Sequence, residues 1–393
     1  MTARILYVTH RVPYPPDRGD RIRTWNILKF LAGRAGVDLA CLADEPASED
    51  TLNVLRGVTN QLAIIPHAGR SRYVRGAISM LSGKTVTEGL FESPALKDKL
   101  REWSQHTKYD AVLASSSGVA RYLFPPYIGA DTRRWVDFID VDSQKWMDYA
   151  KAAKFPMSLV YGTEGRRLRK VECGLAETCE RLLVVSEAER ELFRAFCPTD
   201  RITAVSNGVD YEYFAPQSES HVEPHSCVFV GVMNYKPNAD GAIWFAQNVW
   251  PGIRQRYPDA KFYVVGKSPT PEVQMLSSVA GIEVTGSVPD VRPYLMRSTC
   301  VVVPLQIARG VQNKVLEAMA CGRPVICSPE PLKGLAAEPG VHLLRADSAA
   351  DWIASLSRVF DDKQLQQTFG DAGMKCVQQN YSWNSALALL NEL

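Results

Sequence analysis

The chain has 393 residues, of which 46% are hydrophobic and 22% charged, so it has room for two large domains of ordinary globular composition. A formal net charge of +2 gives no overall argument for binding nucleic acid. The nine cysteines show no C-x-x-C and no metal-type Cys/His spacing, which indicates free thiols in a reducing compartment.

The first predicted element is a strand at residues 4–8, too short and too strand-like for a secretory leader. No apolar run approaches the roughly 20 residues that span a bilayer, so we expect a cytoplasmic protein. Short, near-continuous apolar runs then alternate with amphipathic stretches, which is typical of parallel strands covered by helices on both faces. The pattern predicts doubly wound α/β sheets. The predicted strands are 4–8, 37–42, 61–65, 110–115, 134–138, 182–186, 202–205, 227–231, 261–265, 282–285, 299–304, 324–327 and 341–344.

The loop after the first strand, residues 13–23, is a first candidate binding site. Its prolines stiffen it, Gly19 lets backbone N–H groups approach a ligand, and Asp20 is placed to cap the next helix. A helix start there favours an anion such as a phosphate, and the alternative is an ordinary rigid loop. The loop does not match G-x-G-x-x-G, which argues against a nicotinamide cofactor. His10, at the end of the strand, is the histidine that we expect near the site.

Residues 51–87 contain no Asp or Glu but carry Arg56, Arg70, Arg72, Arg75 and Lys84. Within them, residues 72–82 form a predicted helix with two distinct faces. One reading is a basic amphipathic helix on an anionic membrane, with residues 70–84 as the contact. The other is a surface helix of the first domain with its apolar face in the core. The apolar face consists of Tyr73, Val74, Ala77, Ile78 and Leu81, and the other of Arg72, Arg75, Ser79 and Ser82.

The tetrapeptide at residues 82–85, S-G-K-T, resembles the end of a P-loop. The glycine that a P-loop needs would fall at Ile78, and the segment follows no predicted strand. We therefore reject a nucleoside triphosphatase.

The chain breaks into halves near residues 208–225. Turn chemistry at 207–210 leads into a polar connector at 215–221, and the strand pattern restarts at 227. This predicts two domains, 1–210 and 211–377. Ligands of such sheets bind outside the carboxyl ends of the strands.

The stretch 304–324 is the strongest candidate site. A strand ends there, a polar loop follows, and a helix starts near residue 312 and stops at a glycine, residue 322. Lys314 adds a positive charge for a diphosphate, and the Glu317 carboxylate can accept hydrogen bonds from vicinal hydroxyls, as an acid does on the ribose in dinucleotide folds. The alternative is an exposed i,i+3 helix pair. The predicted anion site consists of the N–H groups after Gly310, those of Val311, Gln312 and Asn313.

The runs Leu-Glu-Ala-Met-Ala at 316–320 and Gly-Arg-Pro at 322–324 resemble the nucleotide-sugar site of glycosyltransferase family 4. That resemblance implies a GT-B fold: two doubly wound parallel-sheet, Rossmann-like domains facing a central cleft. It maps the ribose-binding glutamate of the family onto Glu317. Arg309 stands where the family has a first glutamate that holds the donor sugar; here it would bind a phosphate or an acidic sugar, or point away.

Other segments carry the resemblance across essentially the whole chain. Residues 229–240 resemble the first strand and loop of the donor domain, which maps Lys236 onto the diphosphate-binding lysine of the family. Val232 replaces the arginine that follows the strand glycine, so we expect Lys314 to take over its role. Gly266 and Val288 fall in segments that resemble the two strand ends shaping the base pocket. Residues 206–210 match the interdomain stretch, and 381–384 resemble the start of the last helix, so 378–393 are expected to cross back onto the first domain.

Residues 21–23 and 138–146 most resemble sugar transferases of bacterial exopolysaccharide systems associated with PEP-CTERM sorting. Within the second segment, Asp140 and Asp142 formally match D-x-D, a metal motif of a different glycosyltransferase fold. The motif lies in the first domain, away from the predicted phosphate site, so we expect no metal there. Either carboxylate would orient an acceptor hydroxyl or act as base, with His10 nearby; the alternative is a cap of the next helix.

The resemblance therefore implies a retaining, metal-independent hexosyltransferase without a cofactor. It would move a sugar from a nucleotide-diphosphate sugar to a sugar or lipid-linked acceptor, in exopolysaccharide or glycolipid synthesis. Catalysis would come from positioning the donor and neutralising the leaving diphosphate. Two alternatives stay open: a non-transferring enzyme on this fold, such as a nucleotide-sugar epimerase, and a silent binding partner in polysaccharide assembly.

Overall fold

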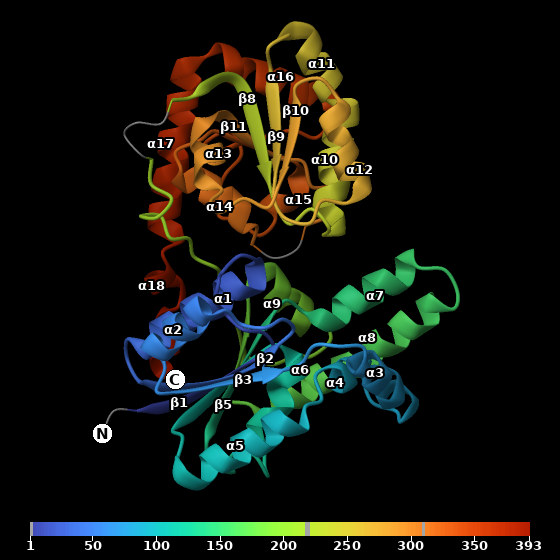
Figure 1. The fold of residues 1–393 in the computed structure, drawn as a ribbon, viewed down its shortest axis with the longest axis vertical. Helices are drawn as coiled ribbons and strands as arrows, with labels where there is room; N and C mark the ends of the chain where they lie inside the picture. The colour runs from blue at the N-terminus through green and yellow to red at the C-terminus, as the bar shows by residue number, and fades with distance from the viewer. Residues whose placement is uncertain (1–2, 217–220, 309–310) are drawn as a thin grey trace. The chain divides into compact units, whose positions relative to one another are not determined.

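The computed structural model describes residues 3–216, 221–308 and 311–393. The chain divides into two compact units. Unit 1 comprises Met1–Ser206 with Leu387–Leu393, and unit 2 comprises Asn207–Ala386. Each unit is a parallel β-sheet with helices on both faces (Figure 1).

The sheet of unit 1 has seven strands in the order β3-β2-β1-β4-β5-β6-β7, all parallel. Its central strands are buried except at their ends, which explains why the sequence shows continuous apolar runs instead of alternation. The strands are β1 Arg4–Thr9, β2 Gly36–Ala43, β3 Gln61–Pro66, β4 Ala111–Ser115, β5 Arg133–Ile139, β6 Arg181–Val184 and β7 Ile202–Ala204.

The helices of unit 1 begin at recognisable signals. Ser48 and Ser93 cap α2 and α5 through their side chains, and Thr85 with Glu88 forms a capping box at α4. The helices are α1 Gly19–Ala32, α2 Glu49–Val58, α3 Ser71–Leu81, α4 Val86–Leu90, α5 Pro94–His106, α6 Ser117–Ala120, α7 Asp142–Ala152, α8 Met157–Thr178 and α9 Glu187–Arg194, with 3-10 turns at Arg121–Leu123 and Ala388–Glu392.

Unit 2 has a six-stranded parallel sheet in the order β10-β9-β8-β11-β12-β13. Its strands are β8 Glu223–Val230, β9 Lys261–Val265, β10 Ile282–Gly286, β11 Ser298–Val303, β12 Val325–Cys327 and β13 Leu344–Arg345. Its helices are α10 Lys236–Asn248, α11 Trp250–Arg256, α12 Pro271–Gln274, α13 Arg292–Arg297, α14 Asn313–Ala320, α15 Pro329–Leu332, α16 Ala349–Asp361, α17 Lys363–Asn380 and α18 Trp383–Ala386, with a 3-10 turn at Met275–Ser278.

The prediction of two doubly wound parallel sheets is confirmed, and a strand lies at or beside each predicted apolar run. The last run, 341–344, is largely wrong as a strand, because pairing starts only at Leu344. Gly340 before it has a positive φ of 82°, and Val341 is 51% exposed, so the chain turns on the surface there. All nine cysteines are free thiols.

The structure of helix α3 contradicts one of the two interpretations of the basic segment at residues 51–87. Its apolar face points outward: Tyr73, Val74 and Ile78 are about 60% exposed and Leu81 is 89% exposed. The face that packs inward contains Gly76 and Ser79 and lies against α4 (Figure 1). The alternative of an apolar face in the core is therefore wrong. Across the described residues, no helix is both long enough and apolar enough to cross a bilayer.

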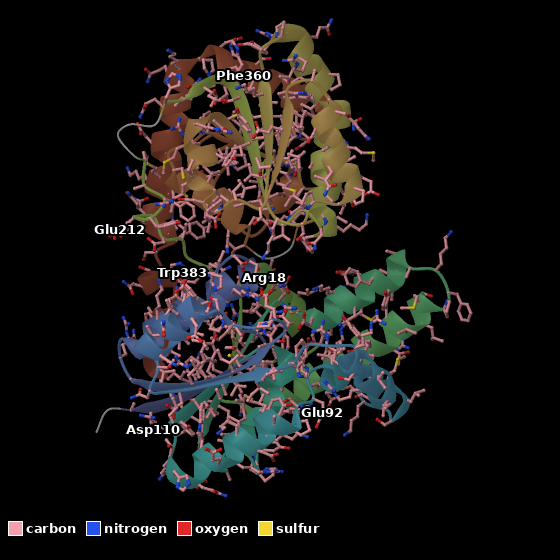
Figure 2. The ribbon with its side chains drawn as sticks, viewed as in Figure 1. Arg18, Glu92, Asp110, Glu212, Phe360 and Trp383 are labelled. Atoms are coloured by element: carbon pink, nitrogen blue, oxygen red, sulfur yellow. The ribbon has the colours of Figure 1, made fainter. Side chains whose placement is uncertain are left out.

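Both sheets reverse their strand order once. In unit 1 the reversal lies between β1 and β4, and in unit 2 between β8 and β11. These switch points, at the carboxyl ends of the strands, are where open α/β sheets bind ligands. Figure 2 shows Arg18, beyond the carboxyl end of β1, far from Asp110, which precedes β4 at the amino edge.

Candidate functional site

The switch point of unit 2 is built from strand ends that approach each other closely. The Gly231 N–H donates to the Val265 carbonyl at 3.0 Å, and the Gly266 N–H donates to the Gly286 carbonyl at 3.1 Å. Gly266 has a φ of 149°, and a Cβ there would lie 1.7 Å from the Gly231 oxygen. Only glycine fits this position, and it allows the ends of β8 and β9 to lie in direct backbone contact.

Lys314, in the first turn of α14, reaches this point. Its Nζ donates to Oδ1 of Asn238 at 2.6 Å and lies 4.9 Å from the centre of the Phe229 ring. The Asn238 side chain is fixed in turn, because its Nδ2 donates to the Val232 carbonyl at 2.9 Å. Burial lowers the pKa of Lys314 to about 8, against the opposing effect of Glu317. An amine held against a neutral amide is poised to accept an anionic partner.

Glu317 and Asn313 lie on the same helix. Burial raises the pKa of the Glu317 carboxyl to about 7, against the opposing charge of Lys314. Asn313 opens α14 and accepts a hydrogen bond from Nδ2 of Asn207 at 3.0 Å. Its own Nδ2 is buried and has no partner among the described residues. Together with the helix N-terminus, this donor suits a ligand oxygen.

The remaining residues predicted in unit 2 are spread more widely. Lys236 is exposed, and its ammonium group pairs with Asp240 on the same helix at 2.7 Å. The lysine that contacts Asn238 is therefore Lys314. Val288 lies half-exposed in the loop after β10, Val311 is buried, and Gln312 is the residue before α14. Arg309 and Gly310 lie outside the described residues.

Sequence reasoning missed Asn238, although it lies with Lys236 in the Lys-Pro-Asn run that begins α10. It also missed a stacked pair near Glu317. The Arg292 guanidinium lies 3.7 Å from the centre of the Tyr213 ring and ion-pairs with Asp290 at 2.7 Å. Burial raises the pKa of Tyr213, and the charges of Asp290 and Glu317 act in the same direction. No sequence pattern links Tyr213 to residues 79 positions away.

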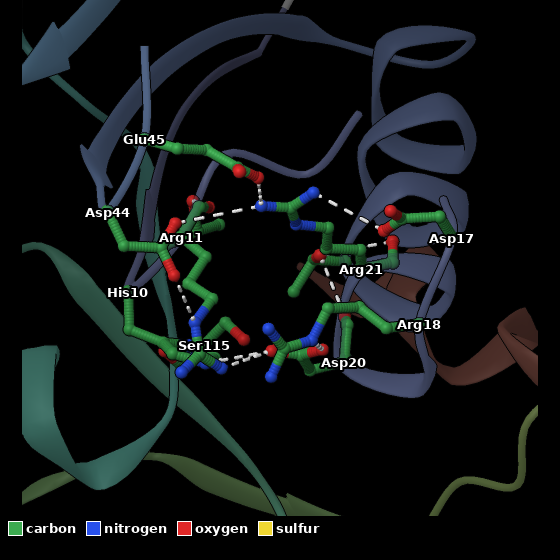
Figure 3. Close-up of polar contacts among 11 residues, drawn as sticks. His10, Arg11, Asp17, Arg18, Asp20, Arg21, Asp44, Glu45 and Ser115 are labelled. Atoms are coloured by element: carbon green, nitrogen blue, oxygen red, sulfur yellow. Dashed lines mark hydrogen bonds and ion pairs between the residues drawn. The ribbon is translucent and has the colours of Figure 1, made fainter. Parts of the chain in front are cut away.

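The switch point of unit 1 contains His10 (Figure 3). Its Nδ1 is 3.1 Å from the Ser115 carbonyl oxygen at the end of β4, and its Nε2 is 3.5 Å from Oδ2 of Asp20. Asp20 also pairs with Arg11 at 2.6 Å and with Arg18 at 2.7 Å. Burial opposes ionisation of Asp20, but the hydrogen bond and charge of His10 and the two arginines hold its pKa well below the usual range. Asp20 is therefore a fixed anion that orients the imidazole.

The arginines of this loop form a wider ring of ion pairs. Arg21 contacts Glu45 at 2.6 Å and Asp17 at 3.3 Å, while Arg11 also contacts Asp44 at 3.2 Å (Figure 3). Gly19 is the first residue of α1, and a Cβ there would meet nothing within 4 Å, so packing does not require glycine. The loop is thus stabilised by ion pairs among its own side chains and with Asp44 and Glu45, which follow β2.

Asp140 and Asp142 follow β5 and lie at the same edge of unit 1. Asp142 is the first residue of α7, and its Oδ2 accepts from Oγ of Ser117 at 3.4 Å. Burial raises the pKa of Asp142, against the charges of Lys145 and His10. Just before them, Ile139 has a φ of 69°, which is strained for a β-branched residue and marks a backbone fixed by its surroundings.

The start of α7 is satisfied by carboxylates from elsewhere. The Val141 N–H donates to Glu189 at 2.7 Å and the Ser143 N–H to Glu172 at 3.0 Å. Glu189 and Glu172 therefore accept the backbone hydrogen bonds at the start of α7 that a capping Asp140 or Asp142 would accept. In the described part of the chain, no group of three or more His, Cys, Asp or Glu side chains is arranged to hold a metal ion.

Comparison with known proteins places unit 2 in a family. Residues 224–362 match the family model described as Glycosyl transferases group 1. A Klebsiella pneumoniae protein described as an uncharacterized 44.6 kDa protein in the cps region is 22% identical over 392 residues, which cover 96% of each chain. An uncharacterized glycosyltransferase of Haemophilus influenzae is 23% identical over 205 residues, covering 49% of this chain and 55% of its own.

Solved glycosyltransferase structures share the fold along nearly the full length. Sucrose-phosphate synthase from Thermosynechococcus elongatus superposes with a TM-score of 0.72 at 16% identity, covering 99% of this chain and 98% of its own. HepE of Anabaena, in complex with UDP and glucose, superposes with a TM-score of 0.70 at 13% identity and the same coverage. With the family match in unit 2 and this fold in both units, the chain is a glycosyltransferase of the GT-B type that carries a group 1 glycosyl transferase domain.

Proposed function

We propose that this glycosyltransferase uses a nucleotide-diphosphate sugar as donor and builds a bacterial exopolysaccharide or glycolipid, retaining the anomeric configuration. The observation that carries the proposal is the placement of Lys314 and Glu317 at the switch point of unit 2. HepE, which shares the fold, binds UDP and glucose, and the Klebsiella relative comes from a cps region.

In this proposal Lys314, Nδ2 of Asn313 and the amides at the start of α14 bind the donor diphosphate, and the Glu317 carboxylate accepts hydrogen bonds from the ribose. The bond between the anomeric carbon and the diphosphate breaks as the acceptor oxygen bonds to that carbon. Negative charge then grows on the leaving diphosphate, where the Lys314 ammonium and the helix amides stabilise it. His10, Asp140 and Asp142 of unit 1 are the candidates to receive the acceptor proton.

The decisive experiment is a screen of nucleotide sugars by mass spectrometry, with bacterial membrane extract as the source of acceptor. A new glycosylated product that needs both donor and extract supports transfer. An epimerase would instead release an altered sugar from the donor alone. A silent partner would bind a nucleotide without turnover, and either result would overturn the proposal.

We also propose that transfer needs no metal ion, because a lysine and helix amides supply the positive charge that a cation supplies in other enzymes. Activity found in the screen should then persist in excess EDTA. Activity lost in EDTA and restored by manganese or magnesium would contradict this and return attention to Asp140 and Asp142.

A further part of the proposal is that α3, within residues 70–84, contacts the anionic cytoplasmic face of a membrane. Its apolar residues face solvent, and Arg70, Arg72 and Arg75 flank them without a nearby acid in the sequence. Each basic residue near an anionic surface contributes about 1 kcal/mol. Replacing the three arginines with Gln should abolish sedimentation with anionic vesicles and leave the fold intact. A wild-type protein that ignores such vesicles at low salt would refute the contact.

A further inference from the structure

A second apolar surface of unit 1 lies at the tip of the hairpin formed by α7 and α8. Figure 1 shows this hairpin extending away from the sheet, with the turn between its helices at the far end. Phe155 in the turn is 81% exposed, Leu159 is 59% exposed, and Met157 and Tyr149 are each 43% exposed. Large apolar side chains gathered at the end of a projection mark an interaction surface.

The hairpin is built to hold its tip in place. Trp146 packs against Tyr161 with ring centres 5.4 Å apart and against Tyr149 at 5.9 Å. A Cβ on Gly165 would lie 2.9 Å from the Met147 side chain, so the two helices are in close contact there. The apolar tip is therefore presented by a braced pair of helices and is not a loose loop.

The same hairpin is joined to α3. Nη1 of Arg167, on α8, donates to the carbonyls of Met80 and Lys84 at 2.6 and 2.7 Å, across the end of α3. Glu164, one turn earlier, accepts from the Val86 and Thr87 N–H groups at the start of α4. The exposed face of α3 and the hairpin tip are thus two parts of one connected group of helices.

The charge around the tip matches that around α3. Residues 149–163 contain no Asp or Glu but include Lys151 and Lys154, both exposed. The nearest acid along α7, Asp148, ion-pairs with Lys151 at 3.7 Å and accepts a hydrogen bond from Nε2 of Gln144 at 2.9 Å. An apolar tip that carries two exposed lysines and no acid is complementary to an anionic lipid surface, where Phe and Leu enter the acyl boundary and Lys contacts the head groups.

We propose that the tip of the α7–α8 hairpin is a second membrane anchor, which inserts Phe155, Met157 and Leu159 into an anionic phospholipid bilayer. The inference extends the proposed membrane contact of α3 and would turn a single attachment into two. Two anchors on one braced group fix the orientation of unit 1 on the membrane. That orientation would present the carboxyl edge of its sheet to a lipid-linked acceptor in a constant way.

The test compares four proteins by sedimentation with vesicles of phosphatidylglycerol and phosphatidylcholine. They are wild type, the tip variant Phe155→Ser/Met157→Ser/Leu159→Ser, the α3 variant with Arg70, Arg72 and Arg75 changed to Gln, and a control with Met275→Ser/Val279→Ser/Val341→Ser in unit 2. The control changes exposed apolar residues outside both surfaces. We expect the tip variant to bind about tenfold more weakly and the control to bind as wild type does.

Salt separates the two anchors. Binding by the arginines of α3 is screened as ionic strength rises, whereas insertion of apolar side chains is not. The tip variant should keep the steep salt dependence of wild type. Any binding that the α3 variant retains should depend on salt much less, because only Lys151 and Lys154 then contact the head groups. Hydrogen exchange of the wild-type protein on vesicles gives an independent reading, because amides of residues 153–160 should become protected.

Each other outcome has a definite meaning. A tip variant that binds like wild type, with no protection at 153–160, overturns the second anchor and leaves the α3 contact standing. Protection at the tip with neutral vesicles alone would contradict the requirement for anionic lipid. A wild-type dimer in solution that the tip variant converts to a monomer would assign the surface to a second copy of the chain. If neither variant changes binding, both anchors fall.

Discussion

The switch points of the two units share one strand order but differ in how their charges are satisfied. In unit 1, His10, Arg11, Arg18 and Arg21 are matched by carboxylates of the same loop and its neighbours. In unit 2, Lys314 rests on a neutral amide, and its pKa is lowered while that of Glu317 is raised. The charges of the loop after β1 are thus paired within unit 1, whereas in unit 2 burial opposes the charges of both Lys314 and Glu317. Groups kept in that state are expected where a charged ligand completes the site.

The same contrast separates Arg23 from Lys314. Arg23 is completely buried, and its guanidinium binds Asp137 through two hydrogen bonds of 2.7 and 2.8 Å and the Val205 carbonyl through a third. This cation ties α1 to β5 and to the end of β7. Mutating one cation of each unit should therefore damage different properties, stability in unit 1 and ligand binding in unit 2.

The largest expected effect is on stability. Arg23→Met leaves the Asp137 carboxylate buried without its partner, which should lower the unfolding free energy of unit 1 by about 3–5 kcal/mol. Urea unfolding followed by circular dichroism measures this. The double variant Arg23→Met/Asp137→Leu removes both charges and should recover most of the loss. A single variant as stable as wild type would show that the pair does not hold unit 1 together.

Lys314→Met should impair ligand binding more than stability, in contrast to Arg23→Met. Removing this lysine should weaken binding of a nucleoside diphosphate by up to about 3 kcal/mol, or roughly a hundredfold, because a charge-assisted contact is lost. The unfolding free energy should change much less than in Arg23→Met, since burial opposes the Lys314 charge and its removal offsets the loss of the hydrogen bond to Asn238. Calorimetry with UDP and a urea melt give the two readings. Unchanged affinity in a folded variant would remove Lys314 from the donor site.

Glu317→Ala should weaken nucleotide binding by about 1.5–3 kcal/mol, the range for a hydrogen bond that involves a charged group. If the Glu317 carboxylate binds the ribose, Glu317→Ala should reduce the binding free energy by a similar amount for UDP and for uridine. A loss seen with the diphosphate alone would instead place Glu317 against Lys314 or the phosphates. Asp371→Ala, at an exposed position of α17 in unit 2, serves as the control and should leave affinity unchanged.

The smallest effect concerns pH. Glu317 gains its charge as pH rises through about 7, and Lys314 loses its charge as pH rises past about 8. Affinity for UDP-glucose, whose diphosphate charge is constant over this range, should therefore rise towards pH 7 and fall above pH 8, by several-fold at each side. Lys314→Arg should remove the alkaline fall, and Glu317→Gln the acidic rise. A flat profile in wild type would mean that neither group titrates in the free site.

Sequence alone determined the architecture and the strongest candidate segment of this protein. Buried parallel strands must be apolar along their whole length, so their number, order in the chain and alternation with helices could be predicted from local pattern. The helix at 313–320 was equally predictable, because a loop, a glycine stop and a charged first turn are local features. Local patterns are reliable there because neighbouring residues alone fix the backbone.

Tertiary structure decided everything that depends on which side chains meet. Arg23 ends the stretch 13–23 that the sequence predicts as a candidate binding site, but the fold buries it against Asp137, 114 residues away. The amphipathic pattern of α3 was clear, yet only its packing on α4 through Gly76 and Ser79 shows that the apolar face points to solvent. The structure also distinguishes the two candidate phosphate-binding lysines. Lys314 donates to Asn238 at the switch point, whereas Lys236 pairs with Asp240 on its own helix. Long-range contacts fix which side chains pair and which helix face points to solvent, and the periodicity of the sequence does not encode these contacts.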